Sequence, residues 1–357
     1  MKNLQDELAE FLSKDSILTE TDDLVAYGMD WTKLPGKACL VVLPKTVEEV
    51  SKILKLCAKH KQKVIPSGGR TGLAAGAVAT GNELVLSLSR MSQIFEIDSL
   101  GRTVRVQAGA TTQSVHEETA KHGLTWPIDL AAKGTSEIGG NLSTNAGGVR
   151  VIRYGMARKW VSALKIVTIE GEIIELNQGL EKNNTGYDLI QLIVGSEGTL
   201  AVITEATLKL CRLPEKISVL FFTVDSYEAI NTLLEKSRSG PFEILAFEFF
   251  SRKCALAVEK QLARKSKLKN SGEFDVLMEI EIPVGVEAQN RVDEWLGEIL
   301  SAGTVKDGLI ASSTEEAKQT WALREGITES LAKTSTVRKY DVAVPVKSMV
   351  AFMTEVE

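Results

Sequence analysis

Two glycine-rich segments carry most of the residues that could bind a ligand through the backbone. They are PSGGRTGLAAG at residues 66–76 and KGTSEIGGNLSTNAGG at residues 133–148. Because glycine has no Cβ, a ligand can approach its peptide group closely, and a glycine loop can present several N–H groups to a phosphate. The first segment has neither the GxGxxG nor the P-loop pattern. It is compatible with a phosphate-binding loop and, equally, with a tight β-turn.

The second segment adds small hydrogen-bonding side chains to its glycines. The polar residues are Thr135, Ser136, Asn141, Ser143, Thr144 and Asn145, and they alternate with Gly139, Gly140, Gly147 and Gly148. An apolar core has no use for such polarity, because buried polar groups must find partners. This pattern favours a ligand site. The structural alternative is a helix N-cap at Ser136 followed by turn residues.

The first segment follows a helix and a strand. Residues 46–60 place apolar residues on one helical face, with Thr46 and Glu49 at capping-box spacing. The run KVIP then predicts a short strand that ends where the glycines begin. We therefore expect a βαβ-like half with parallel strands over the first 80 residues.

Residues of about 100–210 have the pattern of an antiparallel subdomain. Residues 102–109 predict a strand, and residues 162–177 predict a hairpin about a Glu170-Gly171 turn. The stretch 192–210 predicts another strand, entered through Ser196-Glu197-Gly198.

A change of pattern follows CRLPEK at residues 211–216, which we interpret as a linker. Strand, helix, strand, basic helix and strand then follow, with the first helix beginning at Ser226. This order predicts a ferredoxin-like antiparallel sheet with helices on one side. The basic stretch at 251–270 has no interleaved aromatic residues, so we interpret it as a solvated helix face and not as a nucleic-acid site.

Composition excludes several classes of protein. The 357 residues have 44% hydrophobic and 25% charged content and a net charge of −5. These values are typical of a folded domain and give no attraction to nucleic acid or an anionic membrane. Four separated cysteines and three histidines argue against a disulfide scaffold or a zinc ribbon. The acidic N-terminal stretch lacks the features of a signal peptide, so we expect a cytoplasmic protein.

Five motifs, in this order, resemble the FAD-linked oxidases with a PCMH-type FAD-binding domain, especially D-lactate and D-2-hydroxyglutarate dehydrogenases and glycolate oxidase subunits. They are PSGGRTGL (66–73), PIDLAAKGTSEIGGNLSTNAGG (127–148), RYG (153–155), NNTGYDL (183–189) and GSEGTLAVIT (195–204). The resemblance implies an α+β fold: an FAD-binding domain at 1–212, with α+β subdomains of about 1–100 and 101–212. A ferredoxin-like antiparallel substrate or cap domain at 213–357, incomplete at its C-terminus, would follow.

The resemblance also implies non-covalent FAD, since relatives that attach FAD covalently have a histidine where this chain has Arg70. The first loop would hold the pyrophosphate, and residues 127–147 would run along the ribityl chain and the isoalloxazine edge. The motif at 195–204 would line the adenine side. The implied contacts are Pro66, Ser67, Gly68, Gly69, Arg70, Thr71, Gly72 and Leu73; Pro127, Asp129, Ser136, Gly139, Gly140, Asn141, Thr144, Asn145 and Gly147; and Glu197, Gly198 and Ile203. Ala75 and Ala201 stand where relatives commonly have glycine, and each adds a Cβ near the expected cofactor path.

The segment 321–346 resembles the family's substrate-carboxylate motif, which implies Arg324, Thr328 and Lys339 as substrate-binding residues. Arg324 and Thr328 are four residues apart, so we expect them on one face of one helix. The structural alternative is an ordinary amphipathic helix. The implied reaction oxidises a D-2-hydroxy acid, such as D-lactate or D-2-hydroxyglutarate, to the 2-oxo acid by hydride transfer to flavin N5. An electron-transfer flavoprotein or a quinone would be the acceptor.

Family members carry a downstream histidine-rich segment that supplies a divalent metal site, for zinc for example, and the catalytic base. No histidine follows His122 here, so no catalytic base and no metal ligand are assigned. We expect a fragment of a longer enzyme or a chain completed by a partner. The alternative is an FAD-binding module without full turnover.

Overall fold

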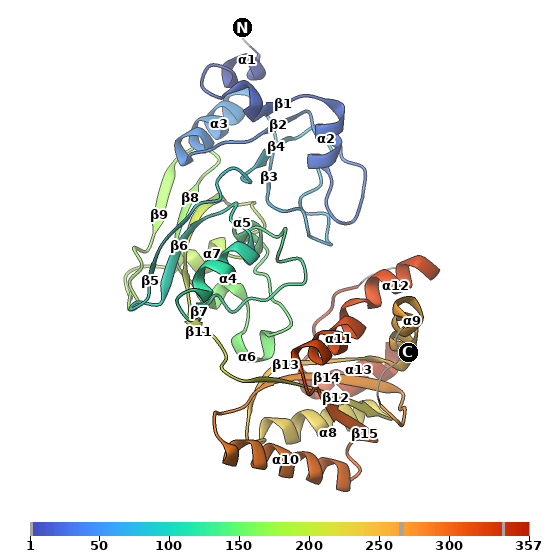
Figure 1. Cartoon of the computed structure of the whole chain (residues 1–357). Coiled ribbons are helices and arrows are strands. Elements are labelled where there is room, and N and C mark those ends of the chain that lie inside the picture. Colours follow the sequence, from blue (N-terminus) through green and yellow to red (C-terminus); the bar gives the residue numbers. More distant parts are fainter. Residues whose placement is uncertain (1–2, 264–267, 338–339, 357) are drawn as a thin grey trace. The chain divides into compact units, whose positions relative to one another are not determined.

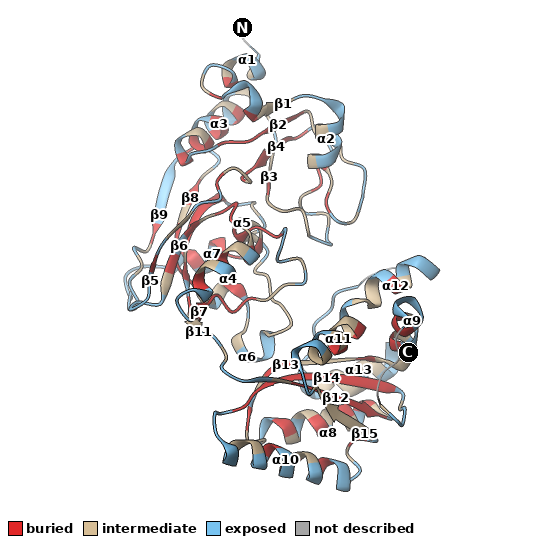
Figure 2. Ribbon diagram, viewed as in Figure 1, coloured by how far each residue is buried: buried red, intermediate tan, exposed pale blue. Residues whose placement is uncertain are grey.

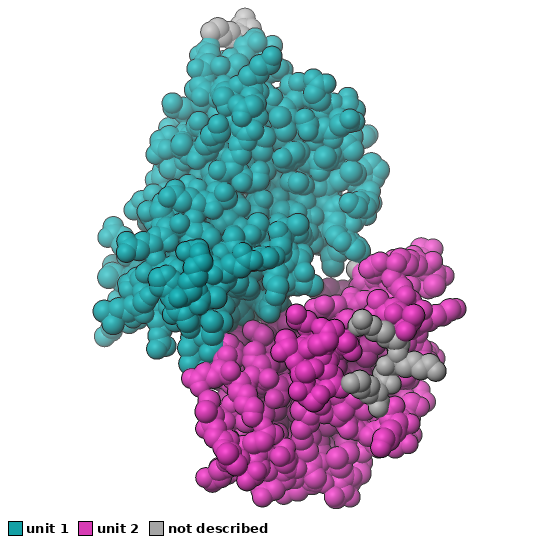
Figure 3. All heavy atoms as spheres, in the orientation of Figure 1, with its two compact units in different colours: residues 1–148, 155–213 teal, residues 149–154, 214–357 magenta. Residues whose placement is uncertain are grey.

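The computed structural model describes residues 3–263, 268–337 and 340–356 (Figure 1). The chain divides into two compact units (Figure 3). The first comprises Met1–Gly148 and Gly155–Leu213, and the second comprises Val149–Tyr154 and Pro214–Glu357. Within the described ranges, no helix is both long and apolar enough to cross a lipid bilayer.

The N-terminal part of the first unit is built on a four-stranded sheet. Its elements are α1 (Leu4–Leu8), a 3-10 helix (Lys14–Ser16), β1 (Ile17–Leu18), α2 (Thr21–Gly28), β2 (Leu40–Val42), α3 (Val47–His60), β3 (Val64–Ser67) and β4 (Leu84–Ser87). The strand order is β1-β2-β4-β3, and both β2 and β3 run parallel to β4. The predicted parallel βαβ-like half is confirmed.

Helix α3 begins where the sequence predicts. The Thr46 hydroxyl accepts a hydrogen bond from the Glu49 N–H at 3.2 Å, and the Glu49 carboxylate accepts one from the Lys45 N–H at 2.6 Å. These bonds stabilise the start of the helix. The buried face of α3, with Val50 and Ile53 at 0% exposure, packs in one core with β2 and β4. Strand β3 pairs with β4 from Val64 to Ser67, and the first glycine segment leaves where this pairing ends.

The remainder of the first unit contains an antiparallel sheet. Its elements are β5 (Ile94–Asp98), β6 (Thr103–Gln107), α4 (Thr112–Ala120), β7 (Leu124–Thr125), α5 (Ile138–Ser143), a 3-10 helix (Ala157–Trp160), β8 (Val161–Val167), β9 (Ile173–Leu176), α7 (Leu189–Ile193), β10 (Val202–Lys209) and β11 (Cys211–Arg212). The sheet order is β5-β6-β10-β8-β9, antiparallel throughout. The antiparallel subdomain and the β8–β9 hairpin are confirmed, and the sheet begins at Ile94, a few residues earlier than predicted.

The second unit has a four-stranded antiparallel sheet. Its elements are α6 (Val151–Tyr154), β12 (Ile217–Val224), α8 (Tyr227–Arg238), β13 (Glu243–Ser251), α9 (Arg252–Leu262), β14 (Phe274–Glu281), α10 (Val286–Ser301), β15 (Asp307–Ile310), α11 (Thr314–Glu325), α12 (Ile327–Thr334), a 3-10 helix (Val346–Ser348) and α13 (Met349–Val356). The order β13-β14-β12-β15 agrees with the ferredoxin-like prediction. Helix α8 begins after Ser226, as predicted.

The prediction that helices cover only one side of this sheet is wrong. One core cluster joins the sheet to α8 and α10, and another joins its other face to α9 and α11. The reason lies in β12, which is apolar on both faces: Leu220 and Phe222 enter the first cluster, and Val219 and Phe221 enter the second. Strand β14 is buried along its whole length (Figure 2).

The short segment Val149–Tyr154 belongs to the second unit, which the sequence did not indicate. Helix α6 packs along β13. Arg150 Nε lies 2.7 Å from Glu279 Oε1, and Arg153 Nη1 lies 2.7 Å from Glu243 Oε2. The first of these ion pairs is less exposed than the second, so loss of either partner would leave a poorly solvated charge there.

Candidate functional site

The first glycine loop leaves β3 with its backbone donors unused. Within the described part of the chain, the N–H groups of Gly68, Gly69, Arg70, Thr71 and Gly72 make no hydrogen bond. All of these residues except Gly72 are half-buried. Successive unpaired N–H groups in a turn form a concavity that suits an anion. The loop therefore fits a pyrophosphate, as the resemblance implies.

Arg70 shapes this loop with its backbone and its side chain. Its φ of 54° reverses the chain, and its Nη1 donates to the Gly68 carbonyl oxygen at 3.3 Å. The guanidinium carbon lies 4.4 Å from the centre of the Tyr27 ring, a cation–π contact with α2. These contacts keep a positive charge beside the five free N–H groups.

The second glycine segment lies directly against this loop. A Cβ on Gly69 would overlap the Thr135 carbonyl oxygen, and a Cβ on Gly68 would lie 3.6 Å from the Gly140 Cα. Gly139 is required by packing, since a Cβ there would lie 2.7 Å from the Ala108 Cβ. Gly69 therefore lets two stretches of backbone meet where a side chain would separate them, whereas the position of Gly68 would accept a Cβ in ordinary van der Waals contact.

The third motif reaches the same place. A Cβ on Gly198 would lie 3.2 Å from the Pro66 Cγ, and the Glu197 N–H donates to the Ser143 carbonyl oxygen at 2.8 Å. Both residues have positive φ, 73° for Gly198 and 53° for Glu197. Segments 66–73, 133–148 and 195–198 therefore converge in the first unit, although up to about 130 residues separate them in the sequence.

Two of the expected cofactor contacts are used inside the protein. Ser136 and Asn141 are buried, and they bond to Thr112: the Thr112 and Ser136 hydroxyl oxygens are 2.9 Å apart, and Asn141 Nδ2 donates to Thr112 Oγ1 at 2.7 Å. The alternative of an N-cap at Ser136 is wrong, because Glu137 is the residue that precedes α5. The polar side chains of Ser136 and Asn141 thus stabilise the second segment through their bonds to Thr112.

The remaining expected cofactor-binding residues differ in their partners and in their burial. Asp129 pairs with Lys133 at 3.0 Å, Asn145 Oδ1 accepts from the Arg158 N–H at 3.0 Å, and Thr144 Oγ1 donates to the Gly140 carbonyl oxygen at 3.1 Å. Leu73 is exposed, Ser67 and Pro127 are buried, and Gly147 is half-buried. Ile203 is 3% exposed and packs in the core of the antiparallel subdomain.

The two alanines at family glycine positions differ in their backbone. Ala75 has a φ of 60°, the left-handed region that costs an L-residue about 1–2 kcal/mol. Ala201 is outside that region and is buried in the core of the antiparallel subdomain. Of the two alanines, Ala75 is therefore the one whose backbone is strained.

Glu137 is a feature of this site that our reading of the sequence passed over. Its side chain is 8% exposed, and a Cβ on Gly68 would lie 3.6 Å from its Oε2. Burial raises the pKa of the Glu137 carboxyl from its usual 4.5 to about 7, and Arg70 opposes that shift. The sequence gives no sign of this acid's burial, because its environment is set by tertiary packing.

Two of the expected substrate residues, Arg324 and Thr328, are described in the second unit, but not on one helix as predicted. Arg324 lies in the last turn of α11, and Thr328 lies in α12, so the expected single helix is two helices that meet at Gly326. A Cβ on Gly326 would lie 2.9 Å from Val258 Cγ1, which shows that the glycine lets this junction pack against α9. Arg324 Nε donates to Glu248 Oε2 on β13 at 2.7 Å. Lys339 lies outside the described residues.

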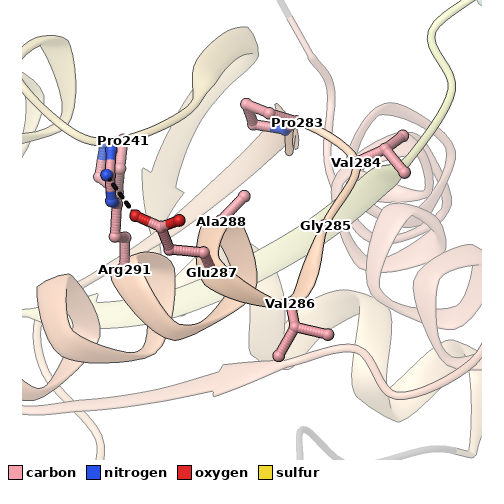
Figure 4. A pocket seen from close by; sticks show the side chains of 8 residues that line it. All are labelled: Pro241, Pro283, Val284, Gly285, Val286, Glu287, Ala288 and Arg291. Carbon is pink, nitrogen blue, oxygen red and sulfur yellow. Dashed lines mark hydrogen bonds and ion pairs between the residues drawn. The ribbon is translucent and has the colours of Figure 1, made fainter.

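A separate hollow of about 380 Å³ lies in the second unit at the start of α10 (Figure 4). Pro241, Val284, Val286 and Arg291 are among the residues that line it. Its charged residues, Glu287 and Arg291, pair with each other at 2.7 Å. None of the expected site residues lines it. In the described ranges, no three His, Cys, Asp or Glu side chains gather as metal ligands.

Comparison with known proteins identifies the class. A family model described as an FAD binding domain matches residues 38–177, and one described as the C-terminal domain of FAD linked oxidases matches residues 213–357. The chain therefore belongs to the FAD-linked oxidase family.

The similar curated proteins are mostly of one kind. The chain is 41% identical to a D-2-hydroxyglutarate dehydrogenase of Xanthomonas citri, over 95% of this chain and 71% of that protein. It is 39% identical to the enzyme of the same name from Stutzerimonas stutzeri, over 99% and 76%, and 35% identical to the mitochondrial one of Danio rerio, over 93% and 62%.

Solved structures show the fold at lower identity. An alkyldihydroxyacetonephosphate synthase aligns with a TM-score of 0.72 and 18% identity, over 92% of this chain and 63% of that one. p-Cresol methylhydroxylase aligns with a TM-score of 0.66 and 17% identity, over 90% and 68%. These likenesses confirm the PCMH-type architecture.

The contact between the two glycine segments can be tested with a matched pair of substitutions. Gly69→Ala should destabilise the apoprotein by about 1–3 kcal/mol, because the new Cβ overlaps the Thr135 carbonyl oxygen. Gly72→Ala should change the stability by less than about 0.5 kcal/mol, because nothing lies within 4 Å of the position. Urea unfolding of both apoproteins measures the difference, and equal stabilities would contradict the packing described here.

Proposed function

We propose that this chain serves the FAD-dependent oxidation of a D-2-hydroxy acid to a 2-oxo acid, with D-2-hydroxyglutarate as the leading substrate. The observation that carries the proposal is the cradle of five free N–H groups, found in a chain 41% identical to a D-2-hydroxyglutarate dehydrogenase. Backbone donors of this kind suit a dinucleotide's phosphates without requiring a cluster of cations.

The residues of the first unit would bind and orient the cofactor. The backbone from Ser67 to Gly72 would hold the pyrophosphate, and Arg70 would add one positive charge beside it. Pro127, Asp129 and the exposed parts of residues 139–147 would follow the ribityl chain and the isoalloxazine edge, with Glu197 and Gly198 on the adenine side. When bound, non-covalent FAD would supply the redox chemistry, accepting hydride from the substrate's carbinol carbon at N5.

In the second unit, Arg324 is suited to hold the substrate carboxylate. Glu248 engages its Nε, and its two Nη groups make no hydrogen bond within the described residues. The outer edge of the guanidinium is thus left free for a bidentate contact with a carboxylate. Glu248 would act as a positioning residue, because it fixes the direction of that edge. Thr328 and Lys339 would contribute to the proposed carboxylate site.

The remaining components of the reaction are proposals of wider scope. An electron-transfer flavoprotein or a quinone is the proposed acceptor, since the first loop lacks an NAD fingerprint. No base and no metal ligand are assigned. The second candidate is an FAD-binding module without full turnover, which the same cradle of free N–H groups supports.

Anaerobic reduction separates the two candidates. The FAD-loaded protein should lose the absorption of oxidised flavin when mixed with D-2-hydroxyglutarate, because hydride reaches the flavin without an acceptor being needed. D-lactate and glycolate test the substrate class, and L-2-hydroxyglutarate is the matched control that should leave the spectrum unchanged. A spectrum that none of these acids bleaches would contradict the dehydrogenase and support the module.

The role of Arg324 can be tested by binding rather than turnover. Arg324→Ala should weaken binding of 2-oxoglutarate about 10- to 100-fold, the cost of losing hydrogen bonds to a charged group. Glu248→Gln should weaken it less, because the guanidinium keeps its charge and loses only its orientation. Titration of the bound-flavin spectrum measures both.

Two controls accompany these variants. FAD affinity should be unchanged in both, and Arg291→Ala, which removes an exposed arginine on α10, should resemble the wild type. Equal losses of FAD and 2-oxoglutarate affinity in Arg324→Ala would count against the substrate role.

A further inference from the structure

Glu137 is held by its backbone so that its side chain faces the first glycine loop. It forms an isolated antiparallel bridge with Thr111, and its carbonyl oxygen accepts from the Asn141 N–H at 2.9 Å. A Cβ on Gly68 would lie 3.5 Å from the Glu137 Cβ and 3.6 Å from Oε2. The carboxyl therefore borders the loop at Gly68, one of the residues whose N–H group is free.

The carboxyl lacks the partners that a buried acid normally has. Its Oε2 is buried, and no described residue makes a hydrogen bond to it. Glu137 precedes α5 but makes no capping bond with its side chain. Leaving a buried carboxyl oxygen unbonded is unfavourable, so a group of this kind points to a ligand.

The surrounding charges do not neutralise Glu137. Arg70, on the first loop, is the charged group that acts on the carboxyl, and its guanidinium is engaged with the Gly68 carbonyl oxygen and the Tyr27 ring. The segment that carries Thr111 and helix α5 with Gly140 and Asn141 present neutral groups. A carboxylate here would thus lie beside the phosphates that the loop is suited to bind, and the like charges would repel.

We propose that Glu137 contacts FAD as a neutral carboxylic acid, donating its O–H to a pyrophosphate oxygen, and that FAD binding takes up this proton from solvent. The inference rests on the FAD site proposed above and extends it to a residue with a pH-dependent role. A neutral carboxyl offers one donor, which a phosphate oxygen accepts, whereas the ionised form offers acceptors only. The proton balance is one H⁺ gained per FAD bound when the empty site is ionised.

The direction of the pH dependence follows from linkage. In the empty site the pKa of Glu137 is about 7, and the pyrophosphate raises it further by repulsion. FAD affinity should therefore be constant well below pH 7 and fall as the pH rises above 7. For one proton, the loss approaches tenfold per pH unit, or about 50-fold between pH 7 and pH 9.

The dissociation constant of FAD, measured on the apoprotein by flavin fluorescence from pH 6 to pH 9, tests this. The FAD affinity of wild type should fall about 50-fold between pH 7 and pH 9. The FAD affinity of Glu137→Gln, whose side chain cannot ionise, should vary less than about threefold over the same range and should exceed that of wild type at pH 9. The matched control is Glu117→Gln, an exposed acid on α4, which should follow the wild type. A flat wild-type profile, or an unchanged slope in Glu137→Gln, would overturn the proposal. An affinity that rises with pH would also overturn it and indicate a carboxylate that accepts from a sugar hydroxyl.

A second measurement needs no variant. Calorimetry of FAD binding to wild type in buffers of different ionisation enthalpy should show about 0.9 proton taken up per FAD at pH 8 and close to none at pH 5.5. FAD binding without proton uptake at pH 8 would overturn the role of Glu137 alone. Failure to bind FAD at any pH would overturn the cofactor assignment as well, so the two failures are distinguishable.

Discussion

The candidate site depends on a meeting of two stretches of backbone. The peptide at Gly69 lies so close to the Thr135 carbonyl that no Cβ fits, and the neighbouring Gly68 lies against Glu137 and Gly140, where a Cβ would make ordinary van der Waals contact. Strand β3 fixes the start of the first loop, and the buried hydrogen bonds among Thr112, Ser136 and Asn141 stabilise the second segment. With both sides fixed, the loop keeps five N–H groups without partners in the described chain. Phosphate binding through the backbone follows from that arrangement.

Backbone strain gathers at the same place. Of the ten described non-glycine residues with positive φ, three lie in the converging segments, Arg70, Asn145 and Glu197, and Ala75 follows the first segment closely. Except for Asn145, whose residue type adopts the left-handed region readily, each costs about 1–2 kcal/mol there, and such strain persists only where neighbouring structure fixes it. The hydrogen bonds of Asn145 to Arg158 and of Glu197 to Ser143 supply that constraint. Stability is thus given up where a ligand is expected to bind.

Much of the fold could be predicted from the sequence, because its elements follow local rules. The capped, periodic helix α3 and the alternating hairpin β8–β9 are examples in which neighbouring residues decide the structure. Contacts between distant residues could not be read in this way. Arg150 of the α6 segment bonds to Glu279, 129 residues later, and Gly326 at the helix break approaches Val258 in α9. The buried acid Glu137 was missed because its environment is set by tertiary packing.

Hydrogen exchange of the backbone amides at residues 68–72, compared between apoprotein and FAD-loaded protein, tests the central claim most directly. Amides without partners should exchange rapidly in the apoprotein, and bound FAD should slow them by at least about tenfold, while the amides of buried strand β14 serve as an unaffected reference. Unchanged exchange at 68–72 in protein whose spectrum shows bound flavin would contradict the assignment of the pyrophosphate to this loop.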